Sequence, residues 1–159
     1  MMTRLGVLVL AIGFAACSAN TKPELVALDM AAYQTDQTIA DVEPLVAQTG
    51  ALTPDQSRGL CQLLRASSIL GLEATHVLQA WDPTQPIPAQ LPGLVRELMK
   101  LAATIVLMLP RDPAVEAALD SAKRREFRAT PEEQLVELDK LWRALLVQID
   151  ARLAVLGKG

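Results

Sequence analysis

The sequence has very few of the side chains on which catalytic and metal sites depend. It contains one histidine and two cysteines in 159 residues, and aromatic residues make up only 3% of the chain. Most metal sites and catalytic dyads need several such groups close together, so we expect no enzymatic activity and no cofactor. The formal net charge is −3. An acidic chain gains nothing from counterion release, so we also expect no nucleic-acid partner.

The sequence also lacks an apolar run long enough to cross a bilayer, which takes about 20 residues. Two uncharged runs stand out, at 5–16 and 101–109. The first follows Arg4 and ends in small residues before Cys17, which is the layout of a secretory signal. The second is interpreted as a buried turn of helix, with a membrane-contacting or partner-binding surface as the alternative.

The residues just before Cys17 indicate how the signal is processed. Residues 14–17 read FAAC, which resembles the lipobox of bacterial lipoproteins. The resemblance implies a diacylglycerol thioether on Cys17 and usually an N-acyl chain, and two or more acyl chains give stable anchoring. It further implies an outer membrane lipoprotein that faces the periplasm, because residue 18 is Ser and not the Asp that often retains such proteins in the inner membrane. The alternative is ordinary cleavage near Ala16 or Ala19, which would leave a soluble periplasmic or secreted protein.

This interpretation divides the chain into three parts: a signal peptide at 1–16, the lipidated cysteine with a short tether at 17–22, and a helical domain at 23–159. With lipid on Cys17, Cys61 is the only free thiol and no disulfide can form within the chain. We expect Cys61 to be a small buried apolar residue, and a reactive or dimerising thiol is the alternative.

Two long helices are predicted in the first half of the domain. Each starts at a capping box, in which Thr21 precedes Glu24 by three residues and Thr53 precedes Gln56 in the same way. Apolar and small residues then recur three and four positions apart, which places them on one face of a helix. These stripes are Leu25, Leu28, Ala32, Thr35, Ile39, Val42 and Val46, then Leu60, Leu64, Ser67, Gly71, Ala74, Leu78 and Trp81. Pro44 should end or kink the first helix near Val42, and Gly50 should close that segment.

The second half predicts a third helix ending near Leu109, a fourth capped by Asp112 and running to about Phe127, and a last one. The last helix starts at Thr130 and ends at Gly157, with a stripe of Leu135, Leu138, Trp142, Leu145, Ile149, Leu153 and Leu156. No segment alternates as a strand does. The sequence therefore predicts an all-α protein, an antiparallel four-helix bundle whose third helix is broken by Pro110 and Pro113. If that break turns the chain sharply, the result is a five-helix array.

The most specific chemical motif is Glu73 and His76, three apart on a helix, as in the metal ligands of di-iron bundles. Such sites need a second motif and further glutamates, and the apolar stripe places this pair on the outer face. We expect a solvated pair and no metal. A Cys61–His76 dyad is excluded because fifteen residues of helix separate the two side chains by about 22 Å.

One cluster of cations remains. Anionic lipid headgroups or a phosphorylated partner could contact it, although cations near a helix end also complement the helix dipole. Its members are Lys123, Arg124, Arg125 and Arg128.

These observations favour a lipid-anchored periplasmic protein with a structural or protein-interaction role, bound to the membrane through Cys17 and to a protein partner. The alternative is a helical module that holds a small apolar ligand between its helices near Ser67, Gly71 and Ala74. A pocket of several hundred Å³ would favour the ligand. A filled core beside an exposed apolar patch would favour the protein partner.

Overall fold

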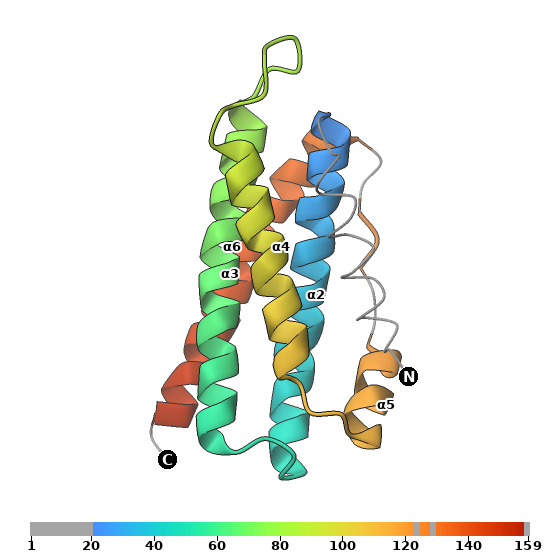
Figure 1. Cartoon of the computed structure of the whole chain (residues 1–159), viewed down its shortest axis with the longest axis vertical. Helices are drawn as coiled ribbons and strands as arrows, with labels where there is room; N and C mark the ends of the chain where they lie inside the picture. The colour runs from blue at the N-terminus through green and yellow to red at the C-terminus, as the bar shows by residue number, and fades with distance from the viewer. Residues whose placement is uncertain (1–20, 123–124, 128–129, 158–159) are drawn as a thin grey trace.

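The computed structural model describes residues 21–122, 125–127 and 130–157 (Figure 1). The described residues form five α-helices and no strand: α2 (Lys22–Gln48), α3 (Pro54–Ala80), α4 (Leu91–Met108), α5 (Pro113–Ser121) and α6 (Pro131–Gly157). The predicted all-α class is confirmed, and four long helices pack together as a bundle. Three of them have 27 residues, a length of about 40 Å each.

The predicted helix starts are confirmed by hydrogen bonds. Thr21 and Thr53 each form a complete capping box, and the Asp112 side chain accepts from the Ala114 N–H at 2.7 Å. Thr130 Oγ1 accepts from the Glu133 N–H at 3.3 Å at the start of α6. Each of these caps satisfies an amide that the helix itself leaves unpaired, so neighbouring residues determine where α2, α3, α5 and α6 begin, whereas α4 begins after Gln90 without a side-chain cap.

The ends of two helices differ from the prediction in part. Pro44 does not end the first helix near Val42, because α2 continues to Gln48, but Gly50 follows it with a left-handed φ of 79°, as expected for the residue that closes the segment. The fourth helix was expected to reach about Phe127, but α5 ends at Ser121 and Ala122 is extended. α5 contributes one fully buried residue, Val115, while Ala118 and Leu119 pack only partly against the core, so little burial stabilises a longer helix.

Two helices form the centre of the bundle. α2 and α3 contact each other, while α4 covers this pair from one side and α6 from the other (Figure 1). Side-chain bonds fix the directions. Thr75 and Ser67 of α3 bond in reverse order to Asp29 and Asp36 of α2, so these two helices are antiparallel.

The last helix departs from the alternating order that the antiparallel bundle implied. Trp142 bonds to Asp29 and Arg152 bonds to Glu43, so α6 runs parallel to α2. After α5, which lies beside the lower end of α2, the chain returns to the other end before α6 begins (Figure 1). Nine residues separate Ser121 from Pro131. A stretch of nine residues can span at most about 30 Å, which makes this return possible.

The predicted stripes form the core. Every stripe residue of α2 and α3 is buried, and so is the α6 stripe as far as Ile149. Trp142 is the largest fully buried side chain, and its ring meets that of Tyr33 edge to face at 5.3 Å. Among the helices of the described segments, we find none with the length and apolar character needed to pass through a bilayer.

Candidate functional site

Most of the site residues expected from the sequence lie outside the described residues or on the surface. Cys17, Lys123, Arg124 and Arg128 fall outside the described ranges. Arg125 is described, and its guanidinium pairs with Glu137 at 3.1 Å. This ion pair ties the segment before α6 to that helix.

Glu73 and His76 lie on the outer face of α3, as predicted. His76 Nε2 lies 2.6 Å from Asp139 Oδ1, and Asp139 also accepts from Arg143. Within the described ranges, no group of three or more His, Cys, Asp or Glu side chains is placed to hold a metal ion. His76 therefore serves as a polar link between α3 and α6.

The small-residue stripe is filled by protein. A Cβ added to Gly71 would lie 2.3 Å from Trp142 Cε2, so this glycine admits the indole between α3 and α6. At Gly71, Trp142 therefore occupies space that the ligand hypothesis assigned to a small molecule, and Ser67 and Ala74 on either side are both 0% exposed.

Sequence reasoning missed the most unusual feature of the interior, a row of three buried acids on α2. Asp29, Asp36 and Glu43 are seven residues apart and each is 0% exposed. We call them the acidic row. Each directly follows a stripe residue, so a stripe one position wider, combined with the seven-residue spacing, could have revealed them.

The first acid is bonded to two other helices. Asp29 accepts from Thr75 Oγ1 at 2.5 Å and from Trp142 Nε1 at 3.0 Å. Burial raises the pKa of Asp29 to about 7, although both hydrogen bonds act in the opposite direction. A carboxyl group here joins α2, α3 and α6 at one point.

The second acid has fewer partners. Asp36 Oδ2 accepts from Ser67 Oγ, and its Oδ1 has no hydrogen-bond partner. Burial raises the pKa of Asp36 to about 7, against the lowering effect of the Ser67 hydroxyl. Because a buried ionised carboxylate needs more partners than this, the protonated form is favoured across the acidic range.

The third acid forms an ion pair. Arg152 donates to Glu43 through Nε at 2.7 Å and through Nη2 at 3.0 Å. Cys61 lies near this pair and is 2% exposed, and burial, reinforced by Glu43, raises the pKa of its thiol to about 12. The thiol is therefore protonated at neutral pH, which agrees with the buried apolar role expected for Cys61.

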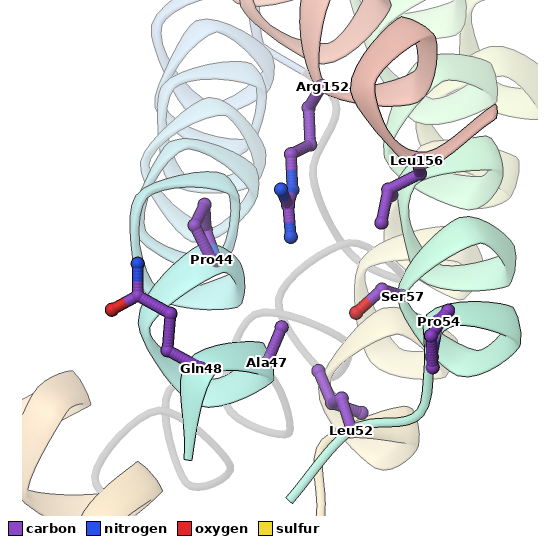
Figure 2. A pocket seen from close by; sticks show the side chains of 8 residues that line it. All are labelled: Pro44, Ala47, Gln48, Leu52, Pro54, Ser57, Arg152 and Leu156. Atoms are coloured by element: carbon purple, nitrogen blue, oxygen red, sulfur yellow. The ribbon is translucent and has the colours of Figure 1, made fainter. Parts of the chain in front are cut away.

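A pocket opens beside Arg152 at the end of the bundle, between α2, α3 and α6. Its volume is about 300 Å³. Figure 2 shows Arg152 entering from α6 and Ser57 from α3. The other lining residues are Pro44, Ala47, Gln48, Leu52, Pro54 and Leu156. The arrangement offers an apolar wall with a hydroxyl and a guanidinium.

We compared the chain with known proteins. No family model matches it, and neither the curated proteins nor the solved structures give a match.

Proposed function

We propose that this protein is a lipid-anchored helical bundle of the cell envelope that acts through contacts with another protein. The anchor is Cys17 in its lipobox-like context, and the bundle stands on the periplasmic side of an outer membrane. The observation that supports an interaction role is an exposed apolar face on α6.

This face occupies the C-terminal half of α6. Val147 is 70% exposed and Val155 is 60% exposed, at positions opposite the buried stripe. Exposed alanines continue the same face at 144, 151 and 154. We call these five residues the outer α6 face. Small and β-branched residues at spacings of three and four let a partner helix approach closely.

The borders of this face are polar and already bonded within the bundle. Gln148 bonds to Gln37 and Asp41 of α2, and Asp150 pairs with Arg65 of α3 at 2.8 Å. A partner can therefore cover the apolar centre without displacing a charge, as at interfaces with an apolar core and a polar rim.

The tether gives this face a position relative to the membrane. Five peptide units separate Cys17 from Lys22, and they span at most about 18 Å. The N-terminal ends of α2 and α6 would thus lie near the lipid. The outer α6 face, in the C-terminal half of that helix, would lie near the end of the bundle that is farther from the membrane. A partner in the periplasm or on a facing surface could reach it.

The test is a crosslinked pull-down of the membrane-anchored protein with Val147→Glu and Val155→Glu combined. A charge in a desolvated apolar contact is costly, so we expect capture of the partner to fall at least tenfold. Ile69→Glu is the matched control, because Ile69 is 44% exposed on α3. Equal capture by wild type and by the double variant, or an equal loss in the control, would reject the proposal.

A second candidate function is supported by the pocket beside Arg152, whose size falls at the lower end of the range for ligand sites. This second function is binding of a small ligand, as in the alternative drawn from the sequence, but in the pocket beside Arg152 and not at the stripe of Ser67, Gly71 and Ala74.

A further inference from the structure

The pocket at the end of the bundle combines an apolar wall with two polar groups. Its volume of about 300 Å³ is enough for a fragment-sized molecule. The apolar part of the pocket wall is formed by Pro44, Ala47, Leu52 and Leu156. Because α2 ends here and α3 begins here, this site lies at the bundle end opposite Lys22 (Figures 1 and 2).

Ser57 provides the first polar group. The residue is 0% exposed, and its Oγ has no hydrogen-bond partner in the part of the chain that the structure describes. Several other helical hydroxyls bond to the preceding turn, as Ser68 Oγ does to the Leu64 carbonyl at 2.8 Å, and Ser67 Oγ bonds to Asp36. A buried hydroxyl without a hydrogen-bond partner is unfavourable. An acceptor atom of a ligand would provide the missing partner for the Ser57 hydroxyl.

Arg152 provides the second polar group. Its Nε and Nη2 are committed to Glu43, while Nη1 has no bond to any residue in the described ranges. Glu43, whose side chain is 1% exposed, already balances the guanidinium charge. A ligand that brought its own charge would add an uncompensated charge to this partly buried site.

We propose that this pocket binds a small uncharged molecule with a compact hydrocarbon body and one carbonyl or hydroxyl oxygen. That oxygen accepts from Ser57 Oγ and from Arg152 Nη1, and the hydrocarbon contacts Pro44, Ala47, Leu52 and Leu156. The inference rests on the second candidate function and is independent of the outer α6 face.

The probe is cyclohexanone, titrated into the ¹⁵N-labelled full chain while the amide shifts of Ala47, Gln48 and Ser57 are followed. We expect saturable shifts with a Kd on the order of 1 mM, within the range for seven non-hydrogen atoms. Cyclohexanecarboxylate, of similar shape but charged, should bind at least about tenfold more weakly because of the uncompensated charge.

Two serine variants on the same helix separate binding from folding. Ser57→Ala should raise the Kd for cyclohexanone about fivefold, as expected for one lost hydrogen bond. Ser68→Ala removes a buried hydroxyl away from the pocket and should leave the Kd unchanged.

The inference is overturned by an absence of saturable shifts, by tighter binding of the carboxylate, or by equal Kd values for both serine variants. None of these results affects capture through Val147 and Val155. Conversely, a pull-down that captures no partner through the outer α6 face does not change the result expected for cyclohexanone binding. The two proposals can therefore be judged separately.

Discussion

The free energy of unfolding should fall by several kcal/mol as the pH rises from 4 to 8, because of Asp29 and Asp36. In the unfolded chain both carboxyls titrate near 3.8, whereas burial raises the pKa of each to about 7 in the folded protein. Below about pH 4 both states hold these protons, so their stabilising contribution is fully present. Between pH 4 and 7 only the unfolded chain releases them, which favours unfolding, and above about 7 the loss is complete.

The size of this effect follows from the pKa difference. About three pKa units for one carboxyl correspond to about 4 kcal/mol. Asp36→Asn imitates the protonated side chain and keeps an acceptor for Ser67. The variant should therefore match wild type near pH 4 and exceed its stability by up to about 4 kcal/mol at pH 8.

Urea denaturation followed by circular dichroism at one-unit pH steps measures this difference. Asp55→Asn is the control, because the Asp55 side chain is 90% exposed and its one ion pair among the described residues is with Arg58 at the helix surface. Its effect on stability should stay within about 0.5 kcal/mol. Parallel pH profiles for wild type and Asp36→Asn would show that burial of this carboxyl does not govern its ionisation.

Replacing Trp142 with alanine should destabilise the fold by about 5 kcal/mol. Removing a buried tryptophan costs about 3–5 kcal/mol, and Asp29 would lose one of its two donors, which costs about 1–3 kcal/mol more. The whole stability of a domain is about 5–15 kcal/mol. The variant should therefore melt tens of degrees lower or fail to fold.

Two further variants test the reason for this effect. Trp142→Phe keeps an aromatic ring near Tyr33 but loses the Nε1 bond and leaves a space beside Gly71, so it should cost about 3 kcal/mol, less than the alanine variant. Gly71→Ala should be destabilising in the wild type, where the new Cβ meets the indole, and neutral or stabilising beside Trp142→Ala. Additive effects of the two substitutions would contradict direct packing of Trp142 on Gly71.

The local sequence was sufficient to predict much of the fold. Cap residues such as Thr21 and Thr53 bond to amides three positions away, so helix starts depend on neighbours in the chain. The apolar stripes were equally informative, because a helix buries the same face along its length. The small residue Gly71 indicated that a neighbouring helix could approach α3 closely, but neither the identity of that helix, α6, nor its contact residue, Trp142, could be predicted.

The interior acids and the direction of α6 could not be predicted in the same way. Asp29, Asp36 and Glu43 border the stripe of α2, and whether this border is buried depends on how closely α6 approaches. Their partners Thr75, Ser67 and Arg152 lie 31 to 109 positions away in the chain. The direction of α6 depends on the long connection after α5, which is compatible with either orientation. The pocket arises where three helix ends meet, and no local pattern encodes such a meeting.

The proposed role depends on the attachment of the bundle to a membrane through Cys17, and the mass of the N-terminal peptide of the mature protein tests this most directly. We expect the mature chain to begin at Cys17, with a diacylglycerol thioether on its side chain and no trace of residues 1–16. An unmodified Cys17, or a mature chain that begins after it, would show that the bundle is not anchored through this residue.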